Sequence, residues 1–273
     1  MRAVDANGIE GAGLTQQELI ELLEEKADEF NRAEFIPHDP ICIPHLFHAK
    51  QDIEIASFLT CTIAWGQRPT IIKNARDLMQ RMDHRPHDFV MNFKKRDKKF
   101  LAGFVHRTFT TLDVVDFIYL LQRIYHTYPS MEEIFAEHMH SPGDACNAIG
   151  KFRDVFFSAP HALRCEKHVS DPRQGSAAKR INLFLRWMVR KDQRGVDFGL
   201  WDKIPMSSLS MPLDLHSGNI ARRLGILSRN QNDWKAVIEL DSFLRSINSA
   251  DPVKYDFALF GLGVFEKSGG IMS

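Results

Sequence analysis

The sequence contains no uninterrupted run of eighteen apolar residues, about the length that a helix needs to cross a membrane. Its first residues, MRAVDANGIEGAGL, also lack the apolar stretch of a secretory signal peptide. Both absences argue against a membrane protein or a secreted one. We therefore expect a cytoplasmic protein that has no membrane partner.

Cysteine is scarce and scattered. The four cysteines are Cys42, Cys61, Cys146 and Cys165, and no two of them form a C-x-x-C pair. Structural zinc sites and iron–sulfur clusters use closely spaced thiolates, so this pattern supports neither. We expect inert thiols in the core and predict no metal site and no cofactor.

The formal net charge of the chain is zero at pH 7. Lysine and arginine together number 35, aspartate and glutamate also 35, and the pI is about 7.2. A protein that coats nucleic acid through overall charge is strongly basic, so this class is excluded. Nucleic-acid binding would have to come from local patches, of which KKRDKK at residues 94–99 is the densest basic run.

No segment alternates apolar and polar residues as an exposed strand does, and no internal repeat is visible. Apolar residues instead recur at helical spacing, and they make up 44% of the chain, enough for a large core. We predict an all-α domain of nine to twelve helices over residues 15–273, preceded by a frayed tail at residues 1–14. Residues suited to capping mark several predicted helix starts, at Thr15, Asp52, Ser176, Asp214 and Asp233.

The segment SMPLDLHSGNIARRLGIL, residues 210–227, carries the most information. Proline keeps the preceding residue extended, and Asp214 then stands where a short helix begins. Its carboxylate can accept a backbone N–H of the first turn, near Ser217, and the helix dipole favours the anion. Gly225 is suited to the end of that helix.

This segment resembles the catalytic-aspartate segment of the helix-hairpin-helix (HhH-GPD) DNA glycosylase superfamily. There an apolar residue, Asp, a small or apolar residue and His precede a helix that closes on Arg-x-Leu-Gly. The resemblance implies a helical fold of two lobes, with a cleft between them lined by the catalytic residues. It also implies base-excision repair of damaged duplex DNA.

The superfamily's hairpin, Gly-x-Gly-x-Lys-x-Ala, resembles GSAAKRINLFLRW, in which Gly175 matches the first glycine and Lys179 the lysine. Ala177 replaces the second glycine. The 35 residues from Lys179 to Asp214 are similar to the spacing in the archaeal 8-oxoguanine glycosylases. We expect a helix from residue 176 to residue 191, with Lys179 in its first turn beyond the cap Ser176.

The resemblance implies that Lys179 is the amine nucleophile. It would attack C1′ of a flipped-out nucleotide, expel the base and form a Schiff base that permits strand cleavage by β-elimination. Only a neutral amine attacks, and the positive end of a helix dipole disfavours the ammonium. Asp214 would be the catalytic carboxylate, which stabilises the cationic sugar and can take the lysine's proton.

Further residues are candidates for binding nucleic acid by the same resemblance. Gln67, after a buried helix, would fill the space left by the flipped base. Lys254, Tyr255 and Asp256 of the final helix would be polar contacts near the site, or simply an exposed helix face. The complete set of predicted nucleic-acid contacts is Gln67, Arg68, Gly175, Ser176, Arg180, His216 and Arg222.

Other interpretations remain open. Lys179 is also a typical solvated lysine on a helix face, and the scaffold could serve a non-catalytic DNA- or RNA-binding protein. The dipeptides His38-Asp39 and His87-Asp88 suggest a metal-dependent HD-type phosphohydrolase, although two-residue motifs are weak. Two tryptophans, Trp187 and Trp201, could stack on a base or belong to the core.

Overall fold

The computed structural model describes residues 13–264, whose regular elements are mostly helices. This confirms the all-α prediction; residues 1–12 of the predicted tail and residues 265–273 lie outside the described residues. None of the described helices is both long and apolar enough to cross a membrane. The twelve described α-helices are α1 (Gln16–Phe30), α2 (Lys50–Thr62), α3 (Arg68–Arg81), α4 (Pro86–Asn92), α5 (Lys98–Leu101), α6 (Thr111–Thr127), α7 (Glu132–Ala136), α8 (Ala145–Phe156), α9 (Lys179–Val189), α10 (Leu215–Arg223), α11 (Trp234–Ile247) and α12 (Tyr255–Val264).

Short elements connect these helices. Two strands, β1 (Val105–His106) and β2 (Phe109–Thr110), form a small antiparallel hairpin in which Val105 pairs with Thr110. Among the 3₁₀ turns are η2 (Pro40–Cys42), η4 (Lys95–Asp97), η5 (Leu163–His168) and η8 (Pro252–Lys254).

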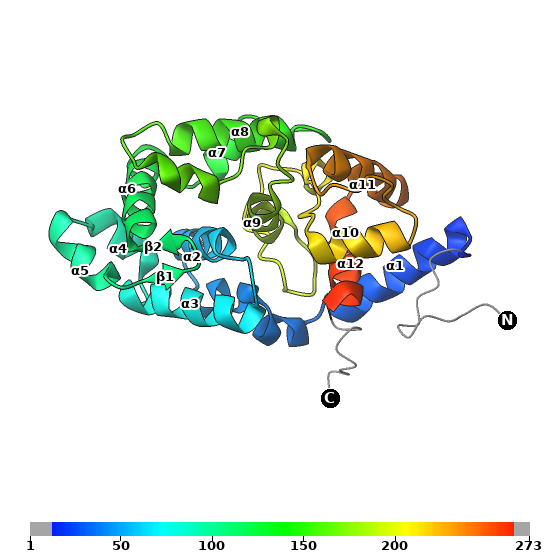
Figure 1. The fold of residues 1–273 in the computed structure, drawn as a ribbon, viewed down its shortest axis with the longest axis horizontal. Helices are drawn as coiled ribbons and strands as arrows, with labels where there is room; N and C mark the ends of the chain where they lie inside the picture. The colour runs from blue at the N-terminus through cyan, green and yellow to red at the C-terminus, as the bar shows by residue number, and fades with distance from the viewer. Residues whose placement is uncertain (1–12, 265–273) are drawn as a thin grey trace.

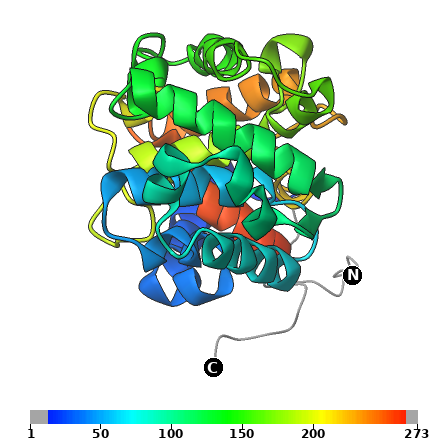
Figure 2. The same ribbon diagram turned by 90° about the vertical axis from the view of Figure 1, so that its left-hand side faces the viewer.

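The first and last helices of the fold lie together. Figure 1 shows α1, α10, α11 and α12 at one end, α4, α5 and α6 at the other, and α9 between them. Figure 2 views the molecule from the end that carries α4 to α6. Helix α9 packs on α2, whereas α12 packs on both α1 and α10. The buried apolar side chains form one continuous core, to which α9 contributes Ile181, Phe184, Leu185, Trp187 and Met188.

Two of the predicted helix caps, whose hydrogen bonds join residues only three positions apart, are confirmed. Thr15 accepts the Glu18 N–H at 3.3 Å and Asp233 accepts the Ala236 N–H at 3.1 Å, as predicted. The prediction for Asp52 was wrong, because α2 already begins at Lys50. The Asp52 carboxylate instead accepts the His87 N–H at 2.9 Å and so ties α2 to α4.

Helix α12 approaches α1 closely because Gly261 has no side chain. A Cβ placed on Gly261 would lie 2.1 Å from the ring of Phe30, which is buried on α1. That separation is far below van der Waals contact. The small residue therefore sets the distance between the two helices.

Replacing Gly261 with alanine should lower the free energy of unfolding by about 1–3 kcal/mol, because the added methyl overpacks the core. The higher helix propensity of alanine, about 1 kcal/mol, offsets only part of this. Chemical denaturation measures the change. As a control, Gly13→Ala should be close to neutral, because no atom lies within 4 Å of its added Cβ. Equal stability of the two variants would contradict the steric explanation.

Candidate active site

Asp214 caps α10 as predicted. Its Oδ1 accepts the backbone N–H groups of His216 at 2.8 Å and Ser217 at 2.9 Å, while its own N–H donates to the Ser217 hydroxyl. The Asn232 amide donates to the Asp214 carbonyl at 2.9 Å. Because the cap uses Oδ1, the second oxygen, Oδ2, remains available to face another group.

That group is Lys179. Its Nζ lies 3.5 Å from Asp214 Oδ2 and 3.5 Å from the carbonyl oxygen of Ala64. The Lys179 side chain is 28% exposed and that of Asp214 17%, so the pair is sheltered but accessible. The tertiary fold therefore joins two residues that stand far apart in the chain.

The start of α9 differs from the prediction. Lys179 is the first residue of the helix, not the third after a Ser176 cap. Ala178 precedes it in the left-handed region, with φ of 47°, and the Ser176 hydroxyl accepts the Ala178 N–H at 3.1 Å. This conformation is unfavourable for a residue with a Cβ and turns the chain sharply just before the lysine.

The Asp214 carboxylate is held in its charged form. Burial alone would raise its pKa, but the Lys179 ammonium and the hydrogen bond from the Ser217 N–H outweigh burial and keep the pKa below its ordinary value. The Asp214 anion therefore faces the Lys179 side chain at neutral pH.

A pocket of about 910 Å³ surrounds this pair. Its size lies in the range of small-molecule sites in proteins, roughly 300–1,000 Å³. Aromatic side chains of Phe35, Trp65 and Phe260 contribute apolar walls. Seven of the nine predicted site residues line it, namely Gln67, Arg68, Ser176, Lys179, Arg180, Asp214 and His216, whereas Gly175 and Arg222 are not among its lining residues.

The turn between α2 and α3 forms one edge of the pocket. Gln67 is exposed there, and the Arg68 guanidinium lies 4.9 Å from the centre of the Phe260 ring. The β1–β2 hairpin supports this turn, because the Arg107 guanidinium stacks on Trp65 at 4.6 Å. His216, at the opposite edge, is exposed and contributes its backbone N–H to the Asp214 cap.

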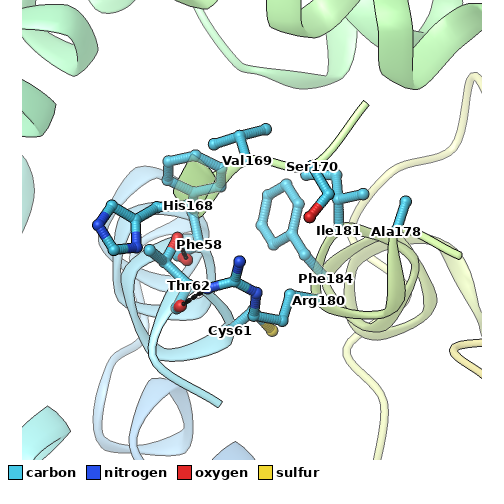
Figure 3. A pocket seen from close by; sticks show the side chains of 10 residues that line it. All are labelled: Phe58, Cys61, Thr62, His168, Val169, Ser170, Ala178, Arg180, Ile181 and Phe184. Carbon is cyan, nitrogen blue, oxygen red and sulfur yellow. Dashed lines mark hydrogen bonds between the residues drawn. The ribbon is translucent and has the colours of Figure 1, made fainter. Parts of the chain in front are cut away.

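Arg180, predicted as a nucleic-acid contact, makes hydrogen bonds that connect parts of the fold. Its guanidinium donates to the carbonyl oxygens of Thr62 at 2.6 Å and Lys167 at 3.1 Å, and Figure 3 shows it reaching Thr62. Burial lowers the pKa of Arg180 to about 10. The side chain joins the end of α2 to η5, and each of its two terminal nitrogens donates one hydrogen bond within the protein.

Arg222 lies behind the site. It donates to the Arg229 carbonyl at 2.8 Å and to the Asn232 side chain at 2.5 Å. Since Asn232 in turn holds the Asp214 carbonyl, Arg222 supports Asp214 indirectly. Gly175 likewise has a structural role, because with φ of 88° it turns the chain, and its carbonyl accepts the Trp234 N–H.

The pocket also contains charged residues that the motif did not identify. Arg186 of α9 is buried, pairs with Asp197 at 3.2 Å and with Asp256, and lies over the Phe257 ring. Asp39 reaches the pocket from η2, where its Oδ1 accepts the Ile41 N–H. No local pattern marks Arg186, because its carboxylate partners are distant in the sequence, whereas Asp39 belongs to the His38-Asp39 dipeptide.

Of the three polar residues predicted near the site in the final helix, only Asp256 lines the pocket. Burial raises its pKa to about 6, against the opposing charge of Arg186, and the Asp214 carboxylate adds to the rise. Lys254 and Tyr255 instead bind the Glu24 carboxylate on α1, at 2.6 Å and 2.5 Å.

The basic run at residues 94–99, the densest local patch of positive charge in the sequence, lies at η4 and α5 and contributes no residue to the lining of the pocket. Both tryptophans that were candidates for base stacking are buried: Trp187 lies in the core, and Trp201 donates to the buried Glu54 at 2.8 Å. Within residues 13–264, no cluster of three or more His, Cys, Asp or Glu side chains is placed to hold a metal ion.

A comparison with protein families matches residues 39–265 to a family described as "Protein of unknown function (DUF2400)". The chain belongs to this family. No curated protein and no solved structure matches it. The matched region contains Lys179, Asp214 and nearly all of the pocket, so the site lies within the part of the chain that defines the family.

A narrow cavity of about 10 Å³ lies between α2, η5 and α9, beside the buried His168 (Figure 3). The His168 Nε2 is 3.6 Å from the Asp113 carboxylate, and its ring packs on Phe109 at 4.8 Å. Burial lowers the pKa of His168 to about 4; the Asp113 charge opposes this shift and Arg180 adds to it.

This histidine predicts a loss of stability in acid. The unfolded chain binds a proton near pH 6.5, whereas folded His168 binds one only near pH 4, so stability falls as pH drops between these values. The total loss of stability is on the order of 3 kcal/mol. Denaturation of wild type and His168→Gln at several pH values measures it. The stability difference between the two proteins should narrow in acid. A difference that stays constant with pH would show that protonation of His168 does not cause the loss.

Proposed function

We propose that this protein is a base-excision DNA glycosylase with AP lyase activity, in which Lys179 is the nucleophile and Asp214 the catalytic carboxylate. The observation that carries the proposal is the 3.5 Å separation of Lys179 Nζ and Asp214 Oδ2 inside a pocket. The resemblance pairs the same two residue types, and it was based on sequence alone. The fold brings them together from different helices.

In the proposed chemistry, Lys179 forms the new bond and Asp214 supplies a negative charge and a proton acceptor. The lone pair of the neutral Lys179 amine bonds to C1′ while the glycosidic C1′–N bond breaks, and the base leaves with that electron pair. The Asp214 anion first stabilises the positive charge that develops on the sugar, and its Oδ2 then accepts a proton from the nitrogen that has bonded to C1′. Return of this proton to the ring oxygen O4′ opens the sugar and gives the Schiff base. Loss of a proton from C2′ to water then breaks the C3′–O bond to the 3′ phosphate, which is the β-elimination.

The surroundings support an extruded base as the ligand. The aromatic rings of Phe35, Trp65 and Phe260 lie on the pocket wall, and flipped bases are bound by stacking and by hydrogen bonds to their edges. Buried polar groups of Asp39, Asp256 and Arg186 line the same pocket and supply donors and acceptors. In this proposal, the pocket is the cleft that receives the flipped nucleotide.

Borohydride trapping tests the proposal. Wild-type protein incubated with a duplex that carries an abasic or oxidised site, in the presence of borohydride, should form a covalent adduct. Digestion and mass spectrometry should then locate the DNA remnant on the peptide that contains Lys179. An adduct on another lysine, or no adduct with any of these duplexes, would refute the proposed mechanism.

A non-catalytic DNA- or RNA-binding protein on the same scaffold is the second candidate. Two observations favour it: Ala177 replaces the second glycine of the hairpin, and Arg180 and Arg222 both donate hydrogen bonds to carbonyl groups within the fold. This candidate predicts salt-dependent binding to nucleic acid with neither an adduct nor base release.

A further inference from the structure

A second groove, of about 630 Å³, runs along the outer face of α3. Pro69, Ile72, Lys73, Arg76 and Gln80 of this helix line it. Their spacing places them on one face of the helix, opposite the buried face formed by Ile71, Ala75, Leu78 and Met79. These five residues form one continuous strip along the exposed surface of α3, and this strip is a wall of the groove.

The strip is cationic in a protein whose net charge is zero. Lys73 and Arg76 are both exposed, and neither lies within ion-pair distance of a carboxylate among the described residues. The acidic lining residue, Asp77, is already paired with Arg81 at 2.8 Å. Two cations on the strip are thus available to a ligand.

The groove joins the active-site pocket. Arg68 and Pro69 line both, and His38 adds a further polar side chain next to Arg68. From Arg68 to Arg76 the helix rises about 12 Å. One strand of a duplex carries roughly three to four phosphates over that length, because they repeat every 3.4 Å along the axis.

We propose that this face of α3 binds the sugar–phosphate backbone of duplex DNA beside the lesion. This inference rests on the proposed function, because the pocket must hold a flipped nucleotide for the flanking backbone to reach the groove. Exposed Lys and Arg side chains at a pocket's edge provide phosphate contacts, which position a duplex without reading its sequence. The neutral charge of the whole chain makes such a local strip necessary for binding DNA.

The test measures binding as a function of salt concentration. The ligand is a synthetic duplex with a tetrahydrofuran abasic analogue, which cannot form a Schiff base. Each phosphate contact contributes about −0.9 to the slope of log affinity against log salt, so Lys73→Ala/Arg76→Ala should make the slope about 2 smaller in magnitude. The charge-preserving variant Lys73→Arg/Arg76→Lys should keep the wild-type slope.

A matched control removes two other exposed lysines, Lys151 and Lys191, which line neither groove nor pocket. Lys151→Ala/Lys191→Ala makes the same change in net charge and should leave the slope within about 0.5 of wild type. Circular dichroism checks that all variants are folded. Equal slopes for both double variants would overturn the inference.

Trapping with a true abasic duplex separates this inference from the proposed function. Lys73→Ala/Arg76→Ala should still form the adduct once protein is in excess, but should need more protein to reach half of the maximal yield. Binding by wild type without any adduct would refute the chemistry and leave the inference standing. Absence of duplex binding by wild type would overturn both.

Discussion

Lys179→Ala should form no borohydride adduct with abasic or oxidised duplexes, whereas wild type should form one readily. Alanine has no amine, so a Schiff base at this position is impossible. The variant should fold normally, because Lys179 is a partly exposed residue at a helix start and alanine suits a helix. We expect the adduct to disappear completely, and gel electrophoresis of the trapped complex measures its amount directly.

The control for this experiment is Lys167→Ala. Lys167 is exposed on η5, and its contribution to the fold is a backbone carbonyl, which the substitution keeps. It should therefore give the wild-type yield of adduct. If Lys179→Ala still formed an adduct, the nucleophile would be another group, and the ion pair with Asp214 would have a structural role only.

Asp214→Asn should slow base excision by about 10²–10³, the range seen when one electrostatic stabiliser is removed from an active site. Asparagine has nearly the same shape, and its side-chain oxygen also caps helices, so the hydrogen bonds from His216 and Ser217 can persist. The negative charge that faces Lys179 is lost. Single-turnover excision on a damaged duplex, measured at saturating protein, isolates this chemical step.

A second substitution separates the charge of Asp214 from its cap. Asp214→Ala removes both, so it should lower the free energy of unfolding by about 0.5–2 kcal/mol relative to Asp214→Asn. Its excision rate should be no higher than that of the asparagine variant. Full activity in Asp214→Asn would remove the catalytic role of the carboxylate, and equal stability of the two variants would contradict the capping role.

Local features of the chain were predicted well. Asp214, Asp233 and Thr15 cap helices because a cap needs only a carboxylate or hydroxyl and the N–H groups two or three residues later. The same rule failed at Asp52, since a competing N–H, that of His87, is brought to it by the packing of α4. It failed at Ser176 as well, where the left-handed Ala178 delays α9.

The sites of the arginines could not be predicted from the sequence. Arg68, Arg180 and Arg222 were equivalent as candidate phosphate partners, yet only Arg68 lies at the junction of pocket and groove. Arg180 donates to the carbonyl oxygens of residues 62 and 167, and Arg222 donates to the carbonyl oxygen of residue 229. A guanidinium has five donors and takes whatever acceptors the fold provides, so its role depends on neighbours distant in the chain.

By itself, the sequence determined the helical class and the helix that begins after Asp214, because apolar spacing and capping are encoded within a few residues. Lys179 and Asp214 became candidates through the resemblance of two short segments to a known superfamily. Only the tertiary structure decided that Lys179 Nζ faces Asp214 Oδ2, that Asp256 and Arg186 share their pocket, and that α3 extends it with a cationic groove. These arrangements depend on how α9, α10 and α12 pack around a common core. Packing brings together side chains that no local pattern relates.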